Sequence, residues 1–82
     1  MSTMIDLEIK RRDGHAHHQQ VMPGVYSIGS DDSNKIKLPA AGISWRHAVL
    51  TITPEGFWIE DLNSDLGTFL DGKRVVGRTP LR

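Results

Sequence analysis

Residues 47–62 read HAVLTITPEGFWIEDL, and this stretch decides the fold class. Residues 47–53 form the longest strand candidate of the chain, with apolar and β-branched side chains that favour a β-strand. Pro54, Glu55 and Gly56 then supply turn chemistry. Residues 57–62 resume with aromatic and β-branched side chains, which favour strands. The stretch therefore predicts a β-hairpin.

The rest of the chain has the same character on both sides of this hairpin. Apolar and polar residues alternate over residues 4–10 and again over 35–38, a run that stops at Pro39. Short strands are predicted at 20–22 and 25–28, separated by the Pro23-Gly24 turn signal. A hairpin with a two-residue Asp71-Gly72 turn is predicted to join 68–70 to 73–76. About eight short strands at this spacing, with no helical stripe, predict an all-β sandwich or barrel.

The composition limits the function classes. With 82 residues, the chain is expected to form one small domain over 1–82. Ten Lys and Arg balance ten Asp and Glu, which argues against a nucleic-acid partner. No apolar run approaches the ~20 residues that span a bilayer, and the N-terminus does not read as a secretory signal. The absence of cysteine fits a reducing compartment. We therefore expect a cytoplasmic domain without membrane insertion.

No cofactor or metal site is expected. The histidines at 15, 17 and 18 are predicted to lie in a solvated loop, because no carboxylate or thiolate stands at ligand spacing. No glycine-rich phosphate cradle is present. Solvated faces, rather than a nucleic-acid stripe, are predicted for Arg11, Arg12, Arg74 and Arg78.

Four short motifs occur in order in the segments that join these strands. They are IG at 28–29, SWRH at 44–47, DLNSDLGT at 61–68 and DG at 71–72. This order resembles the FHA (fork-head-associated) family, whose pattern runs Gly-Arg, Ser-x-x-His, Asp-x-x-Ser-x-Asn-Gly-Thr and Asn-Gly. The resemblance covers residues 25–81. It implies an FHA-like β-sandwich that binds a phosphothreonine peptide with the loops at one end, and no enzymatic activity.

The resemblance also assigns roles to individual residues. Ser44 matches the phosphate-binding serine of the family, and His47 matches a histidine that ties loops together. Gly67 and Thr68 match the pair that turns the chain into the next strand. Gly29 matches the glycine that precedes the family arginine.

Other positions depart from the family pattern. Ser30 stands where the phosphate-binding arginine is expected, and Leu66 replaces the asparagine that holds the peptide backbone. Trp45 stands where a second basic residue often follows the serine, and Asp65 adds a negative charge. Each hydrogen bond to a charged group contributes about 1.5–3 kcal/mol. Losing two such contacts costs about 3–5 kcal/mol, or two to four decades of affinity.

We therefore expect a protein-interaction module that is phospho-independent or only weakly phosphopeptide-selective, in a signalling or secretion assembly. The predicted partner-binding residues are Ser30, Ser44, Trp45, Arg46, Asp65 and Leu66. Alternatives are a working phosphothreonine reader, with Arg46 or Lys35 replacing the missing arginine, and a small hydrolase built on Ser44, His47 and Asp61. Ser44 can also serve only to turn the chain, and Trp45 can pack over its loop instead of contacting a partner.

The C-terminus carries a further expectation. Residues 75–81 resemble the family's run toward its last hairpin, and the final two strands of the family have no counterpart in this sequence. The sandwich is therefore expected to be truncated, which leaves residues 4–10 as an open strand edge. Such an edge favours pairing with another chain. We expect self-association or completion by a partner strand, with a fragment of a longer protein as the third reading.

Overall fold

The structure is a computed structural model that describes residues 4–11, 14–70 and 72–81. Within these residues the chain forms strands and no helix, so none of the described segments is a helix able to cross a membrane. The strands are β1 (Ile5–Lys10), β2 (Ala16–Val21), β3 (Gly24–Gly29), β4 (Ile36–Lys37), β5 (Ala48–Thr53), β6 (Gly56–Asp61), β7 (Phe69–Leu70), β8 (Lys73–Arg74) and β9 (Arg78–Leu81).

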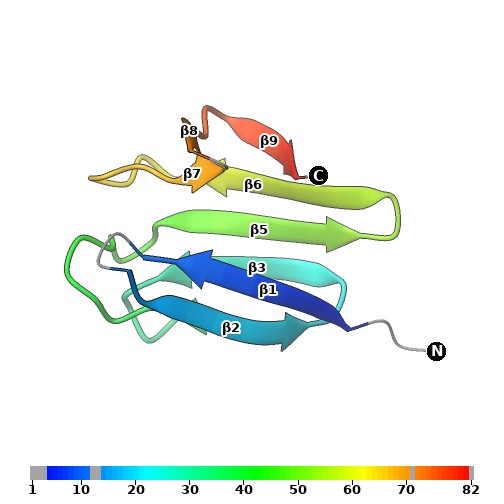
Figure 1. Cartoon of the computed structure of the whole chain (residues 1–82), viewed down its shortest axis with the longest axis horizontal. Coiled ribbons are helices and arrows are strands. Elements are labelled where there is room, and N and C mark those ends of the chain that lie inside the picture. The colour runs from blue at the N-terminus through cyan, green and yellow to red at the C-terminus, as the bar shows by residue number, and fades with distance from the viewer. Residues whose placement is uncertain (1–3, 12–13, 71, 82) are drawn as a thin grey trace.

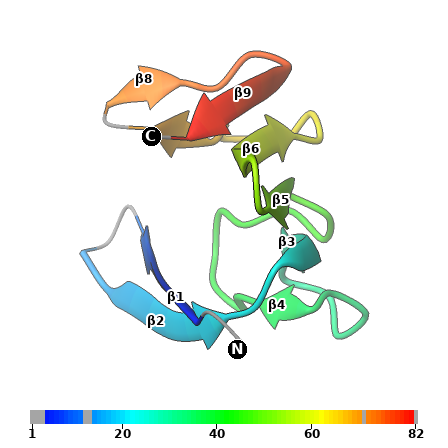
Figure 2. The same ribbon diagram turned by 90° about the vertical axis from the view of Figure 1, so that its right-hand side faces the viewer.

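The strands form two layers. One layer is a five-stranded sheet in the order β4-β3-β5-β6-β9, in which only the short β3–β4 pair is parallel. The hairpins β1–β2 and β7–β8 form separate two-stranded sheets. Figure 2 shows the β1–β2 hairpin facing the curved five-stranded sheet, with β8 beside β9 at the other end. The prediction of an all-β fold is confirmed.

The hairpin predicted from residues 47–62 lies at the centre of the large sheet. β5 pairs with β6 in the register Ala48↔Asp61 and Leu50↔Ile59. The hydroxyl of Thr53 accepts the N–H groups of Glu55 and Gly56, each at 3.2 Å, which closes the turn. The hydroxyl thus gives hydrogen-bond partners to N–H groups that have no strand partner where the chain reverses.

Period-two patterning places the core between the layers. On β5, Ala48, Leu50 and Ile52 are all buried, and the side chains between them are only half-buried. On β6, Phe57 packs on the core, whereas Trp58 lies on the outer face under the guanidinium of Arg78. The buried apolar side chains are Val21, Ile28, Ile36, Leu38, Ala48, Leu50, Ile52, Ile59 and Val75.

The N-terminal hairpin differs from the sequence prediction. Residues 16–21 form the complete strand β2, so the prediction of a short strand at 20–22 with His17 and His18 in a loop was wrong. β2 pairs along its whole length with β1, from Ile5↔Val21 to Lys10↔Ala16. Its sequence AHHQQV lacks apolar alternation, and β1 supplies most of the apolar side chains of this hairpin, with Ile5, Leu7 and Ile9 packed against the core. Pairing with β1 makes this segment a strand. Arg12 and the turn residue Asp71 lie outside the described residues.

Candidate functional site

The residues singled out from the sequence meet at one end of the sandwich. The β3–β4, β4–β5 and β6–β7 loops lie together there, at the left of Figure 1, whereas β1 begins and β9 ends at the opposite end. These loops carry Ser30, Ser44, Trp45, Arg46, His47, Asp65, Leu66, Gly67 and Thr68, and Gly29 ends the strand that enters the first of them. The fold thus brings three separate sequence motifs to a common surface.

Gly29 allows two of these loops to touch through their backbones. A β carbon placed on Gly29 would lie 2.0 Å from the carbonyl oxygen of Trp45 and 2.8 Å from Nδ2 of Asn34. A side chain cannot fit at this distance, so the position requires glycine. The close approach lets the N–H of Ser30 donate to the carbonyl of Ser44 at 3.1 Å.

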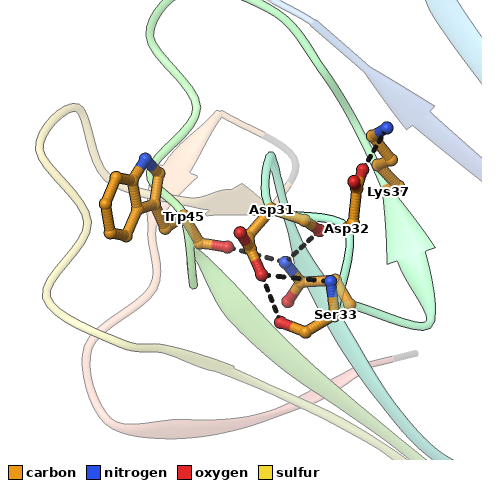
Figure 3. Close-up of polar contacts among 6 residues, drawn as sticks. Asp31, Asp32, Ser33, Lys37 and Trp45 are labelled. Carbon is orange, nitrogen blue, oxygen red and sulfur yellow. Dashed lines mark hydrogen bonds and ion pairs between the residues drawn. The ribbon is translucent and has the colours of Figure 1, made fainter.

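Asn34 fastens the same two loops, and sequence reasoning missed it. The side chain is only 8% exposed. Its Nδ2 donates to the carbonyl of Asp31 at 2.9 Å and to the carbonyl of Trp45 at 2.7 Å. Figure 3 shows the carbonyl of Trp45 directed into this contact and its indole directed away from it. In the sequence, Asn34 ends the polar run DDSN, where nothing distinguishes a buried amide from an ordinary loop residue.

His47 joins the second loop to the third. The backbone N–H of Ser44 donates to Nδ1 of His47 at 3.2 Å, so the ring hydrogen lies on Nε2, which donates to the carbonyl of Gly67 at 2.9 Å. The hydroxyl oxygen of Ser44 accepts the N–H of Asp65 at 3.1 Å. Because that hydroxyl acts as an acceptor within the protein, its hydrogen remains for a ligand.

This geometry opposes the hydrolase alternative. Both ring nitrogens of His47 are engaged by backbone groups, and neither is left to take a proton from the hydroxyl of Ser44. Asp61 is also occupied by other partners. A nucleophile, a base and an orienting carboxylate must be joined in one hydrogen-bonded chain. Ser44, His47 and Asp61 do not form that chain.

Asp61 organises the β6–β7 loop. Its Oδ1 accepts the hydroxyls of Thr68, at 2.7 Å, and of Ser64, and its Oδ2 accepts the N–H of Ser64 at 3.1 Å. Burial alone would raise the pKa of Asp61, but these hydrogen bonds outweigh it and hold the pKa below the ordinary value. The carboxylate therefore stays charged and fixes the loop that carries Asp65 and Leu66.

Most charges of the β3–β4 loop already have partners. Hydrogen bonds from the hydroxyl and the N–H of Ser33 lower the pKa of Asp31, and the nearby guanidinium of Arg46 lowers it further. Asp32 forms an ion pair with Lys37 (Figure 3). Lys35 is also engaged, because its Nζ lies over the ring of Tyr26, 5.7 Å from the centroid.

The positions that depart from the family pattern are accessible. Ser30 is half-buried, and Asp65 is exposed. Leu66 is 44% exposed and packs on Gly42, where its Cδ1 lies 2.8 Å from the place of a β carbon. Trp45 is 78% exposed, so its indole does not pack over the loop. The loop end therefore presents one large aromatic ring to solvent.

A model of the FHA domain family matches residues 26–82. This chain belongs to the FHA domain family. The resemblance that the sequence predicted over 25–81 is thus confirmed at the level of the family. FHA domains are protein-interaction modules, and homologues of this chain bind phosphothreonine peptides.

Individual relatives support the assignment. The ABC transporter ATP-binding/permease protein Rv1747 of Mycobacterium tuberculosis is 41% identical over 56 residues, which are 68% of this chain and only 6% of that protein. The FHA domain of the CT664 protein from Chlamydia trachomatis has the same fold, with a TM-score of 0.81 and 24% identity over 96% of this chain and 81% of that one.

Two further solved structures are similar. A structure from an analysis of phosphothreonine-dependent FHA domain interactions has a TM-score of 0.75 and 26% identity, covering 95% of this chain and 80% of that one. Mycobacterium tuberculosis EmbR, in complex with a low-affinity phosphopeptide, has a TM-score of 0.69 and 26% identity, covering 99% of this chain and 20% of that one.

The FHA loop end also contains a residue that was predicted to lie on a solvated face. Arg74, on β8, is exposed but lies against the β6–β7 loop at Gly67. A β carbon placed on Gly67 would lie 3.0 Å from Nε of Arg74 and 3.3 Å from its Cζ. The hairpin pairing of Phe69 with Arg74 brings the guanidinium to this position. The sequence around Arg74 does not predict this contact, because the contact arises only when the β7–β8 hairpin brings Arg74 back to the β6–β7 loop.

Proposed function

We propose that this FHA domain binds a segment of a partner protein with its three loops and selects little for phosphothreonine. The observation that carries the proposal is the pair Ser30-Asp31. Ser30 stands where the family resemblance expects the phosphate-binding arginine, and the next residue is Asp31, a carboxylate of lowered pKa where a guanidinium would suit a phosphate. A phosphate carries about −1.5 to −2 charges, so a fixed carboxylate beside it is unfavourable.

The residues that remain available suit an unmodified peptide. The hydroxyl of Ser44 has its hydrogen free to donate to a peptide carbonyl. Trp45 extends from a loop whose backbone is fastened by Asn34, so its exposed ring is offered to a partner from a fixed point on the surface. Arg46 is exposed beside it. The three loops thus offer both polar and apolar side chains, with the exposed Leu66 as a second apolar group.

The test compares phosphorylated and unphosphorylated copies of one threonine peptide by titration. We expect less than a tenfold preference for the phosphorylated copy, or about 1.4 kcal/mol. The double variant Ser30→Arg with Leu66→Asn restores the two family contacts and should raise that preference, whereas Leu66→Asn alone should raise it less. A tenfold or greater preference in the unmodified protein would refute the proposal.

That same result would support the second candidate function, a working phosphothreonine reader. The observation that favours it is the unused hydroxyl hydrogen of Ser44, the residue that matches the family's phosphate-binding serine. Arg46 would then have to supply the guanidinium. In the described structure its charge already acts on Asp31. Phosphate binding by Arg46 would have to compete with that interaction.

We also propose a route to assembly. Among the described residues β1 pairs only with β2, so one edge of β1 offers unpaired N–H and C=O groups. Strand pairing with a second copy or with a partner strand would satisfy them. Light scattering after size exclusion, from micromolar to millimolar concentration, is expected to show association. A monodisperse monomer throughout would exclude self-pairing.

The parent assembly and the location stay predictions. A signalling or secretion assembly is proposed, and the identification of proteins that co-purify with the chain would test it. The 41% identical relative is an ABC transporter protein, which is compatible with a membrane-associated assembly. Cell fractionation would test the predicted cytoplasmic location.

A further inference from the structure

Arg74 is the starting point, because its guanidinium lies on a glycine of the ligand-binding loops. Three of its atoms, Nε, Cζ and Nη2, lie 3.0, 3.3 and 3.4 Å from the place of a β carbon on Gly67. Gly67 has a φ of 84°, a conformation that side-chain-bearing residues rarely adopt. Because Gly67 has no side chain, the guanidinium of Arg74 can lie directly against the backbone of the loop. The Arg74 side chain nevertheless stays exposed to solvent.

The backbone beneath this contact is well fastened. The carbonyl of Gly67 accepts Nε2 of His47 at 2.9 Å. On the other side, the N–H of Val75, which follows Arg74, donates to the carbonyl of Thr68 at 2.8 Å. Two residues before Gly67, the N–H of Asp65 donates to the hydroxyl of Ser44 at 3.1 Å. Arg74 and the ligand-facing hydroxyl of Ser44 are therefore fixed to the same short segment, 65–67.

Arg74 also differs from Lys37, Lys35 and Arg46, because no interaction within the described residues engages its charge. Lys37 is paired with Asp32, the Nζ of Lys35 lies over Tyr26, and Arg46 acts on Asp31. Within the described ranges, Arg74 has no hydrogen bond, ion pair or ring contact. An incoming anion would therefore meet an unneutralised guanidinium at Arg74.

We propose that Arg74 binds an acidic group of the partner segment, either a carboxylate or a phosphate, beside the residue held at Ser44. A guanidinium binds both groups through two parallel N–H···O contacts. An extended peptide spans about 3.3–3.6 Å per residue, so the acidic residue stands within a few positions of the one at Ser44. This assignment rests on the proposed function, since it takes the loop end as the binding surface.

The test uses an alanine-based nonapeptide with a central threonine and one aspartate moved through the other positions. Dissociation constants come from NMR titration, which measures millimolar binding. For the unmodified protein we expect aspartate at one or two adjacent positions to strengthen binding about threefold to tenfold. Arg74→Ala should abolish the gain and Arg74→Lys should keep part of it. Lys73→Ala is the matched control, because successive strand residues face opposite sides, and it should keep the whole gain.

The source of the anion is settled by a second set of peptides with phosphoserine at the best position. A larger gain with phosphoserine, lost in Arg74→Ala, identifies a phosphate, and an equal gain identifies a general acidic contact. A gain that survives Arg74→Ala, a gain at no position, or no binding at all would overturn the inference. Repeating the series with a central phosphothreonine separates the two proposals. A tenfold preference for that set with the Arg74 dependence intact would overturn only the proposed function.

Discussion

Replacing Gly29 by alanine should destabilise the protein by forcing apart the β3–β4 and β4–β5 loops. The added carbon would stand 2.0 Å from the carbonyl oxygen of Trp45, which must retreat by about 1.5 Å to reach a van der Waals separation of about 3.5 Å. That movement breaks the bond from Asn34 to this carbonyl and the bond from Ser30 to Ser44. Each contributes about 0.5–1.5 kcal/mol, and overpacking adds about 1–3 kcal/mol.

The total, about 2–6 kcal/mol, is large for this chain. At about 0.05–0.15 kcal/mol per residue, a chain of this length has about 4–12 kcal/mol of stability. Thermal melting followed by circular dichroism should show the midpoint lowered by at least about 10 °C.

The matched control is Gly56→Ala. The nearest atom to a β carbon there would be Cη2 of Trp58, at 3.5 Å, which is an ordinary contact. We expect a change within about 1 kcal/mol, since the loss of backbone freedom in the unfolded chain is slightly stabilising. Equal melting temperatures for Gly29→Ala and the unmodified protein would refute the reasoning, because they would mean that the loops separate at no cost.

The other predictions concern three side chains of the same loops. His47→Ala leaves an N–H and a carbonyl without their partner, so chemical denaturation should show a loss of about 1–3 kcal/mol; an unchanged midpoint contradicts the bridging role. Asp61 has a lowered pKa when folded, so its contribution is present above the unfolded value of 3.8 and is lost as the pH falls below it. Melting from pH 7 to pH 2.5 should therefore show the gap between the unmodified protein and Asp61→Asn narrowing below about pH 4, and a constant gap would contradict this. Trp45→Ala should weaken partner binding about tenfold or more with little change in melting temperature, because the indole is 78% exposed; unchanged affinity would remove Trp45 from the binding surface.

The sequence was informative where one face of a strand is buried and the other is not. The apolar and β-branched run in 47–53 predicted β5, and the Pro54-Glu55-Gly56 signal placed the turn into β6. The alternation in 4–10 likewise predicted β1. β2 could not be predicted in this way, since AHHQQV shows no periodic hydrophobicity and is made a strand by its pairing with β1. A pattern within one segment does not show which other segment will pair with it.

The candidate site was predictable only as far as the family motifs extend. Those motifs located Ser44, His47 and the 61–68 loop, which the structure brings together. Asn34 and Arg74 escaped because each acts through a contact distant in sequence: one with the carbonyl of Trp45 and one with the bare backbone of Gly67. Neither contact leaves a mark on the neighbouring residues. Departures such as Ser30 and Leu66 predict which family contacts are missing, but the sequence does not show what replaces them.

At position 45 the loop is held through the peptide carbonyl and not through the exposed indole, so the shape of the loop does not depend on the identity of this side chain. Asn34 and Gly29 contact atoms that every amino acid possesses. Randomising position 45 should therefore yield a library in which nearly all members fold and only the recognised partner varies. A family built on such an arrangement can acquire new partners by point substitution without first acquiring compensating changes in its framework. The same property makes position 45 the natural place to graft a new contact residue when this domain is used as a binding scaffold.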